Sequence, residues 1–129
     1  MYKRQAQYAA YAALNGTKEE VCRMRGEFVV RRDYMVERIN KIPLVSCAVP
    51  KGAFYVMMNI NRLFGRSING KKITGSLGFS EALLDLAKVA VVPGVVFGAE
   101  GYVRLSYATS LKNITKGLDR IMSFIELLD

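Results

Sequence analysis

The sequence predicts an α+β domain in which a small antiparallel sheet packs against long helices. The chain has 129 residues, which is room for one domain, and its composition (51% hydrophobic, 23% charged) is that of an ordinary globular protein. Long segments with helical spacing lie at both ends, and short strand-like runs lie between them. A few antiparallel strands covered by long helices form such a layer, whereas a doubly wound sheet would need strands and helices in alternation.

The first third of the chain predicts two helices. Residues 5–14 are rich in alanine and tyrosine, and Asn15-Gly16 is a typical helix stop. Residues 17–20 (Thr-Lys-Glu-Glu) match a capping box that would open a second, long helix. Pro43 would end it, because the residue before a proline avoids helical backbone angles. The apolar residues at helical spacing in this helix are Val21, Met24, Phe28, Met35, Ile39 and Ile42.

The middle of the chain predicts a hairpin followed by a loop. Residues 44–49 and 53–60 are strand-like, and Pro50-Lys51-Gly52 between them is a turn signal. Residues 65–75 are polar and contain glycine, with Asn69-Gly70 as a tight turn. We therefore expect an exposed loop or a small hairpin there.

The last third predicts a short helix, two strands and a final helix. Ser76 would cap the short helix, whose inward residues would be Phe79, Leu83 and Leu86. Residues 89–92 and 102–107 read as strands. Thr109 and Ser110 are good caps for the final helix, which is too short for a coiled coil and is expected to dock on the sheet. Its apolar stripe consists of Leu111, Ile114, Leu118, Ile121, Ile125 and Leu128.

Composition argues against several classes of function. The net charge is +8, but the basic residues are scattered and never exceed two in a row, so a solvated surface is expected and not a nucleic-acid interface. The longest apolar stretch, residues 89–99, is too short to cross a bilayer, and no secretory signal is recognised. Cys22 and Cys47 suit a reduced cytoplasmic protein with buried thiols.

The residue types give no catalytic apparatus of their own. Without histidine the chain cannot form a histidine-based triad or an ordinary zinc site, and two distant cysteines do not make a metal cluster. The glycines at 65, 70, 75 and 78 lack the spacing of a phosphate-binding loop. No catalytic, metal-binding or cofactor-binding residue is therefore predicted within the chain.

One basic residue nevertheless stands out. Alternation along the predicted strand at 102–107 places Arg104 between apolar neighbours, on the face that it shares with Tyr102 and Ser106. Charged groups are rarely buried without a partner. Arg104 could form a structural ion pair, reach solvent from an edge strand, or hold a carboxylate through the two parallel hydrogen bonds of its guanidinium fork.

Several motifs, taken in order and spacing, resemble the end of class I aminotransferases. These motifs are residues 51–55 (Lys-Gly-Ala-Phe-Tyr), 89–94 (Val-Ala-Val-Val-Pro-Gly), 97–98 (Phe-Gly) and 102–108 (Tyr-Val-Arg-Leu-Ser-Tyr-Ala). Residues 7–10 and 31–33 match as well, and residues 63–67 (Leu-Phe-Gly-Arg-Ser) are most similar to bacterial aspartate aminotransferases. The resemblance runs from about Gln5 to Asp129, and it implies that residues 5–129 are the C-terminal small domain of a fold type I enzyme.

The resemblance implies an activity and a role for Arg104. Class I aminotransferases use pyridoxal 5′-phosphate to move an amino group between an amino acid and a 2-oxo acid in amino-acid metabolism and biosynthesis. They are normally homodimers, with active sites between a large and a small domain. The arginine of the family's final strand binds the substrate α-carboxylate, and it falls on Arg104 here. Aspartate is the implied substrate.

The sequence also departs from the family pattern. The family's Schiff-base lysine and its cofactor-binding residues lie upstream of the position matched by Gln5, and no lysine here has the serine-rich flank of that motif. We therefore expect residues 5–129 alone to be inactive and the large domain to be a missing partner. Residues 1–4 do not match and are interpreted as a non-native or truncated leader. The alternative is a free-standing, non-catalytic interaction or regulatory domain derived from an aminotransferase.

Overall fold

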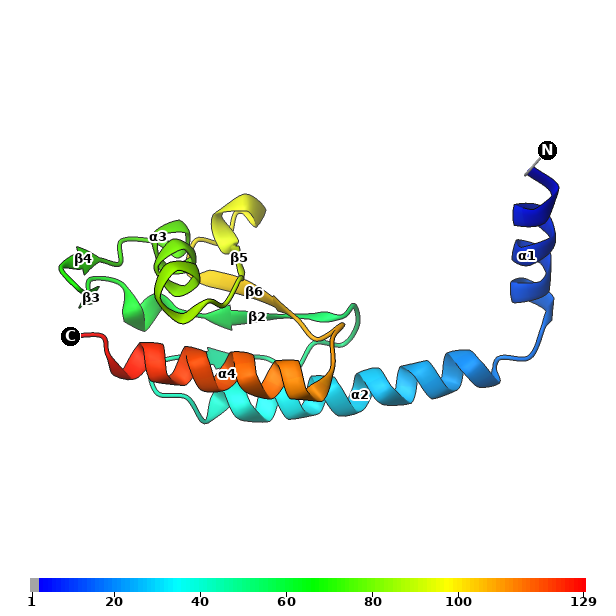
Figure 1. The fold of residues 1–129 in the computed structure, drawn as a ribbon, viewed down its shortest axis with the longest axis horizontal. Helices are drawn as coiled ribbons and strands as arrows, with labels where there is room; N and C mark the ends of the chain where they lie inside the picture. The colour runs from blue at the N-terminus through cyan, green and yellow to red at the C-terminus, as the bar shows by residue number, and fades with distance from the viewer. Residues whose placement is uncertain (1–2) are drawn as a thin grey trace.

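A computed structural model describes residues 3–129 and has the predicted α+β architecture, with a small antiparallel sheet packed against long helices (Figure 1). Its helices are α1 (Lys3–Asn15), α2 (Glu19–Asn40), α3 (Ser76–Ala82) and α4 (Leu111–Glu126). Its strands are β1 (Ser46–Cys47), β2 (Tyr55–Asn59), β3 (Ser67–Ile68), β4 (Lys71–Lys72), β5 (Val92–Pro93) and β6 (Tyr102–Ser106). Short 3₁₀ turns cover Asn61–Leu63 and Gly94–Phe97, and a π-helical turn, Leu83–Ala87, continues α3.

The main sheet has the strand order β1-β2-β6-β5, and every neighbouring pair is antiparallel. The longest ladder joins β2 to β6, with Val56 opposite Leu105 and Met58 opposite Val103. These four side chains are buried, because they face α2 and α4 on one side of the sheet (Figure 1). The core is therefore a layer between this face and the two long helices.

Helix α4 forms as its apolar stripe predicts. Ser110 is its N-cap, and the Ser110 hydroxyl accepts a hydrogen bond from the N–H of Asn113 at 3.2 Å. Five of the predicted stripe residues are buried, whereas Leu111 is 40% exposed at the helix start. Phe124 adds to the stripe and meets the Phe79 ring edge-on at 5.8 Å, which joins α4 to α3.

A polar network also joins α4 to α2. Arg38 donates to Asp119 and, at 2.8 Å, to the Tyr34 hydroxyl, which is in turn 2.8 Å from the Thr115 hydroxyl. The hydrogen bond to Asp119 raises the pKa of Arg38 further above its usual value. The two helices are thus held together by apolar packing and by a charged pair at its edge.

The predicted capping box at residues 17–20 is wrong. Helix α2 begins one residue later, with Lys18 as its N-cap, and no side chain makes a capping hydrogen bond there. The helix ends at Asn40, three residues before the predicted stop at Pro43. Its apolar face is only partly used: Met35 and Ile39 are buried, but Val21 and Met24 are about half exposed (58% and 48%). The sheet and α4 cover the second half of α2 and leave the first half uncovered.

Two of the predicted strands are shorter than expected. The run at 44–49 pairs only at Ser46–Cys47, because Leu44 has a positive φ of 67° that breaks the extended backbone. The Asn40 side chain then makes strand-like bonds to Cys47, accepting from its N–H at 2.9 Å and donating to its carbonyl at 3.2 Å. The run at 89–92 enters the sheet only at Val92, because the Val89 N–H still closes the preceding helix by donating to the Leu83 carbonyl.

The short helix differs from prediction in its cap and in one inward residue. Gly75 is the N-cap of α3, and Ser76 is the first helical residue. Phe79 and Leu83 are fully buried as predicted, but Leu86 is 48% exposed. The π-helical turn holds more residues per turn than an α-helix and so rotates Leu86 away from the core.

The loop at 65–75 contains the predicted small hairpin. Strands β3 and β4 pair antiparallel around Asn69-Gly70, both of which have positive φ (50° and 75°). Such backbone angles are those of the tight hairpin turn that an Asn-Gly pair favours. The hairpin is not wholly exposed, because Ile68, directly before the turn, and Ile73, directly after β4, are buried.

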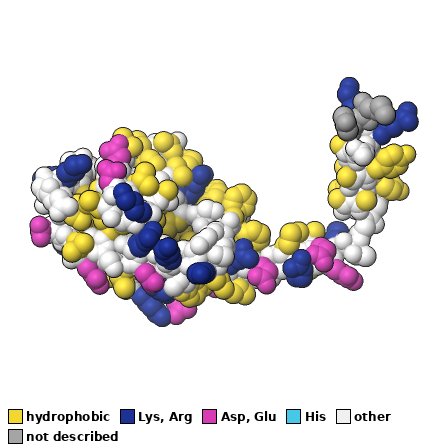
Figure 2. All heavy atoms as spheres, in the orientation of Figure 1, with side chains coloured by type: hydrophobic (Ala, Val, Ile, Leu, Met, Phe, Trp, Pro, Cys, Tyr) yellow, Lys and Arg dark blue, Asp and Glu magenta, His cyan; other side chains and the backbone are white. Residues whose placement is uncertain are grey.

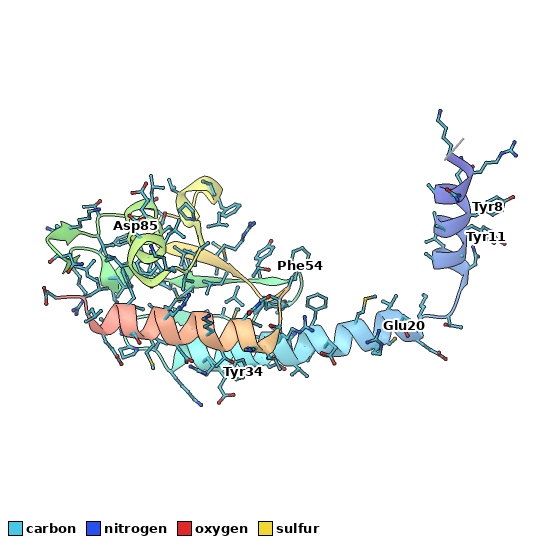
Figure 3. The ribbon with its side chains drawn as sticks, in the orientation of Figure 1. Tyr8, Tyr11, Glu20, Tyr34, Phe54 and Asp85 are labelled. Carbon is cyan, nitrogen blue, oxygen red and sulfur yellow. The ribbon has the colours of Figure 1, made fainter. Side chains whose placement is uncertain are left out.

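Helix α1 forms as predicted and has no buried residue. It stands at the far end of α2 from the sheet (Figure 1), and hydrophobic side chains lie on its surface and along the neighbouring part of α2 (Figure 2). Tyr8 and Tyr11 project from one side of α1, away from the sheet (Figure 3). Residues 3 and 4 of the predicted leader belong to α1, and residues 1 and 2 lie outside the described residues. No described helix is long and apolar enough to cross a membrane.

The two helix starts give a matched test of capping. Ser110→Ala removes the hydroxyl that accepts from Asn113, so it should lower the free energy of unfolding by about 0.5–2 kcal/mol. Thr17→Ala removes a hydroxyl that makes no capping bond, so urea unfolding followed by circular dichroism should show almost no change. A larger loss for Thr17→Ala than for Ser110→Ala would contradict this assignment of caps.

The cysteines should differ in reactivity. The sequence predicts buried thiols, but Cys22 is exposed, and only Cys47 is partly buried. Burial raises the pKa of Cys47 to about 11, so roughly one thiol in a thousand is ionised at pH 8. Mass spectrometry should show iodoacetamide labelling Cys22 well before Cys47, and Cys47 labelling in Cys22→Ser should accelerate roughly a hundredfold between pH 8 and pH 10. Equal labelling rates at pH 8 would contradict the burial of Cys47.

Candidate functional site

The face of the sheet opposite α2 and α4 carries the polar residues of β6. Val103, Leu105 and Tyr107 are buried on the core side, as the alternation predicts, and Arg104 is half-buried on the other side. Arg104 lies opposite Met57 of β2 and Val92 of β5 in the sheet register. A strand on either side thus fixes the backbone of Arg104, and only its side chain is left to move.

Two aromatic rings hold the Arg104 side chain. The guanidinium carbon lies 4.7 Å from the centre of the Phe97 ring and 5.2 Å from that of Tyr55. Cation–π contacts of this kind stabilise an arginine by about 0.5–2 kcal/mol each. Neither contact is a hydrogen bond, so the N–H groups that form the fork keep their capacity to donate.

Arg104 has no acidic partner within the described residues. The five ion pairs found there use other cations, namely Arg23, Arg31, Arg32, Arg38 and Lys41. Of the three possibilities left open by the sequence, a structural ion pair within residues 3–129 is therefore not observed. β6 is also an inner strand, between β2 and β5, and not an edge strand.

Tyr55 is held in place by the turn before β2. The Tyr107 hydroxyl donates to the carbonyl of Ala53 at 2.8 Å, and the Phe54 carbonyl accepts from the Tyr107 N–H at 2.9 Å. Burial raises the pKa of Tyr107, which keeps this hydroxyl a donor. The Phe54 ring stands edge-on to the Tyr55 ring at 6.2 Å, beside the start of β2 (Figure 3). The residues after β6 thereby fix the ring that contacts Arg104.

Phe97 comes from the turn between β5 and β6. Gly94 starts this turn where the backbone leaves no room for a side chain: a Cβ there would lie 2.0 Å from the carbonyl oxygen of Ala99. Gly98 ends it with a φ of 69°. The sequence shows residues 93–94 and 97–98 only as motifs of the family resemblance, and it does not reveal the contact of Phe97 with Arg104. An aromatic residue in a turn beside a strand arginine is the only sequence signal for that contact.

A shallow hollow runs along the same open face beside Arg104. It extends from the loop after β1 across β2 to the start of β6, and it is lined by residues 46–50, Gly52, Ala53, Tyr55, Met57, Asn59 and Tyr102. Tyr55 belongs both to this hollow and to the aromatic contact with Arg104. A small ligand that reaches the guanidinium would therefore lie against an apolar and aromatic floor.

The described residues offer no evident cofactor or metal site. Within residues 3–129 no group of three or more acidic or cysteine side chains could hold a metal ion. All nine lysines of the chain are exposed: Lys3, Lys18, Lys41, Lys51, Lys71, Lys72, Lys88, Lys112 and Lys116. The arrangement can bind and orient an anion at Arg104, but it supplies no enclosed amine or acid–base pair for covalent chemistry.

Comparison with known proteins gives consistent matches over almost the whole chain. The sequence model of the family described as "Aminotransferase class I and II" matches residues 1–121. A probable aspartate/prephenate aminotransferase of Rickettsia typhi is 43% identical over 117 residues, which are 90% of this chain and 29% of that protein.

Solved structures match the fold equally well. The aspartate aminotransferase of Rhizobium meliloti superposes with a TM-score of 0.92 and 37% identity, covering 95% of this chain and 31% of that one. The alanine aminotransferase of Pyrococcus furiosus superposes with a TM-score of 0.83 and 28% identity, covering 94% and 29%. The chain thus spans less than a third of the length of these relatives.

Proposed function

The chain belongs to the class I and II aminotransferase family, and on this premise we propose that residues 5–129 are the C-terminal small domain of an aminotransferase in which Arg104 binds the substrate α-carboxylate. The observation that carries the proposal is the Arg104 guanidinium, which makes cation–π contacts with Phe97 and Tyr55 and lacks an acidic partner within residues 3–129. An amino acid and a 2-oxo acid both present a carboxylate that this fork fits.

The chemistry of Arg104 supports this role. A planar guanidinium binds a carboxylate through two parallel hydrogen bonds and so fixes the plane of the acid group. The two rings limit rotation of the side chain before substrate arrives, which reduces the entropy lost on binding. Holding the carboxylate in one orientation aligns the bonds at the neighbouring carbon, which is catalysis by positioning.

The names of the relatives support a proposal for the substrate. Relatives from Rickettsia typhi and Rhizobium meliloti carry the name aspartate in their descriptions, so we propose aspartate as the amino donor. The structurally similar protein from Pyrococcus furiosus is described as an alanine aminotransferase, so this domain serves relatives of different specificity. We further propose a cytoplasmic homodimer, as is usual in the family.

Pyridoxal 5′-phosphate is the cofactor that the family implies, and the described residues do not fit it as a binding site. Each lysine is exposed, and the hollow beside Arg104 is lined by no lysine. We therefore assign the cofactor site and the Schiff-base lysine to the large domain of the proposed enzyme, and Arg104 is the contribution of residues 5–129 to the active site.

The exposed surface of α1 favours a domain of a larger enzyme over a free-standing interaction or regulatory domain. A self-contained domain should cover its own apolar side chains, yet Tyr8, Tyr11 and Leu14 are 74%, 68% and 81% exposed. Val21 and Met24 of α2 are also about half exposed, and Figure 2 shows hydrophobic side chains uncovered on both α1 and the neighbouring part of α2. Such a surface suits a helix that packs against another domain.

Arg104 can be tested in a chimera in which residues 5–129 replace the matching part of the Rhizobium meliloti aspartate aminotransferase. Removing one partner of a desolvated charge pair costs about 2–5 kcal/mol, so Arg104→Ala should lower kcat/KM for aspartate roughly thirty- to several-thousand-fold. Arg104→Lys should retain more of the parent kcat/KM than Arg104→Ala but not all of it, because an ammonium group lacks the two-pronged fork of a guanidinium. Steady-state kinetics measure both.

Arg120→Ala is the matched control, because Arg120 is an exposed arginine of α4 on the other side of the sheet, where it donates to the carbonyl of Lys88. Its kcat/KM should stay within about twofold of the parent chimera, as for a surface substitution of little energetic effect. A loss below threefold for Arg104→Ala in an active chimera would rule out the proposed role.

The assignment of the cofactor site predicts how the 129-residue chain meets pyridoxal phosphate. Borohydride reduction of the mixture should leave low labelling spread over many lysines, because all nine are exposed and none is enclosed. Peptide mass spectrometry measures how the label is distributed among the lysines. The same mixture, before reduction, should not transaminate aspartate. One lysine that carries most of the label at stoichiometric yield would show that this chain holds the cofactor itself.

A further inference from the structure

We infer that Ser76 and Glu100 are positioning residues for Arg104, because their hydrogen bonds hold the turn that places the Phe97 ring on the guanidinium. The inference rests on the proposed function, in which Arg104 receives a carboxylate. Neither residue contacts Arg104 by a hydrogen bond or ion pair, and both lie on segments other than β6. Their effect therefore passes through the turn Gly94–Phe97.

The link begins at the start of α3. One carboxylate oxygen of Glu100 accepts from the Ser76 N–H at 2.6 Å, and the other lies 3.3 Å from the Ser76 hydroxyl, which donates to it. The carboxylate sits against the Cα of Gly75, where a Cβ would come within 2.2 Å of it. A charged acceptor makes a strong bond to a backbone N–H at a helix start. Glu100 is thus fixed at both oxygens by one residue.

The link continues from Ser76 to the turn. The Ser76 side chain is fully buried, and its hydroxyl oxygen accepts from the N–H of Val95 at 3.1 Å. Val95 is the second residue of the turn that ends with Phe97, so α3 is joined to this turn by a buried hydroxyl. Ser80, one turn further along α3, also bonds to Ser76: the Ser80 hydroxyl donates to the Ser76 carbonyl at 2.7 Å.

The turn itself is closed by its own backbone. The Ala99 N–H donates to the Gly94 carbonyl at 2.9 Å, and the Gly98 N–H donates to the Val95 carbonyl at 3.0 Å. These two hydrogen bonds close residues 94–99 into a compact turn, and the Ser76–Val95 bond together with Glu100 ties that turn to α3. The Phe97 ring at the end of the turn is 49% exposed, and its centre lies 4.7 Å from the guanidinium carbon of Arg104.

The exposure of Phe97 explains why hydrogen bonds are needed to hold its ring near Arg104. A ring that is half exposed is not held by core packing, in contrast to the fully buried Phe79 of α3. Its location relative to Arg104 then depends on the backbone of the turn, which is tied to α3 by the Ser76–Val95 hydrogen bond and by the Ser76–Glu100 contact. Loss of either bond should free Phe97 and widen the range of guanidinium orientations.

The experiment uses the 129-residue chain labelled with nitrogen-15 and follows the side-chain Nε–H signal of Arg104, identified by its absence in Arg104→Lys. Because the guanidinium carbon lies 4.7 Å over the centre of the Phe97 ring, we expect an upfield ring-current shift of this signal, and Phe97→Leu measures the size of that contribution. Ser76→Ala and Glu100→Ala should each lose more than half of it. Glu100→Gln keeps a carbonyl acceptor for the Ser76 N–H and should retain most of it.

Matched variants separate positioning from general destabilisation. Ser123→Ala and Glu81→Gln remove an exposed hydroxyl of α4 and an exposed charge of α3, and both should leave the Arg104 signal unchanged. Amide signals of α4 report whether each variant is folded. If Ser76→Ala does not fold, the comparison of Glu100→Ala with Glu100→Gln tests the inference. An Arg104 signal that keeps its full shift in folded Ser76→Ala or Glu100→Ala overturns the inference, and so do equal losses in Glu100→Ala and Glu100→Gln.

Succinate distinguishes this inference from the proposed function. A shift of the Arg104 signal with succinate, beyond that with sodium chloride at equal ionic strength, supports carboxylate binding, and a weaker shift in Ser76→Ala supports positioning. If the parent chain does not respond to succinate, carboxylate binding by Arg104 fails, and the ring-current losses still decide whether Ser76 and Glu100 place Phe97. If Ser76→Ala and Glu100→Ala lose the ring-current shift of the Arg104 signal but respond to succinate as the parent chain does, the claim that the position of Phe97 serves carboxylate binding is overturned.

Discussion

The antiparallel ladder between β2 and β6 is the constraint on which the rest of the structure depends. Because side chains alternate along a strand, pairing Val56 with Leu105 and Met58 with Val103 fixes one face for the core. The same register places Met57 opposite Arg104 on the other face. A shift of one residue would bury the guanidinium and expose the core, so the energy of core burial also holds Arg104 at the open surface.

The sequence is informative where a pattern and its environment agree. The stripe of α4, the Asn69-Gly70 turn and the alternation around Arg104 were predictable, because each needs only its own segment and one apolar partner surface. The exposed Val21 and Met24 were not, because their helical spacing does not say whether any partner covers them. The exposed Leu86 and the short strand at Val92 depend on a π-helical turn and on a late helix-closing bond, which no local pattern specifies.

The candidate site was predictable in its central residue and not in its surroundings. A strand arginine between apolar neighbours identifies Arg104, and the family resemblance gives it a role. The aromatic rings belong to Phe97 and Tyr55, which are 7 and 49 positions from Arg104 in the sequence. The link that holds the turn uses Glu100 and Ser76, which are 4 and 28 positions away. Their convergence follows from the sheet order β1-β2-β6-β5, which is a property of the folded chain and not of any one motif. Sequence reasoning therefore finds the charge but not the groups that orient it.

Helix α2 has a mechanical consequence of its own. With 22 residues it is about 33 Å long, and only its second half is embedded in the core, while α1 is attached to its distant end. A hydrogen-bonded helix resists bending, so a small tilt at the embedded half is magnified into a larger sweep of α1. If α1 packs against another domain, as proposed, a displacement of α1 would be transmitted along α2 to its embedded half, against which the sheet packs.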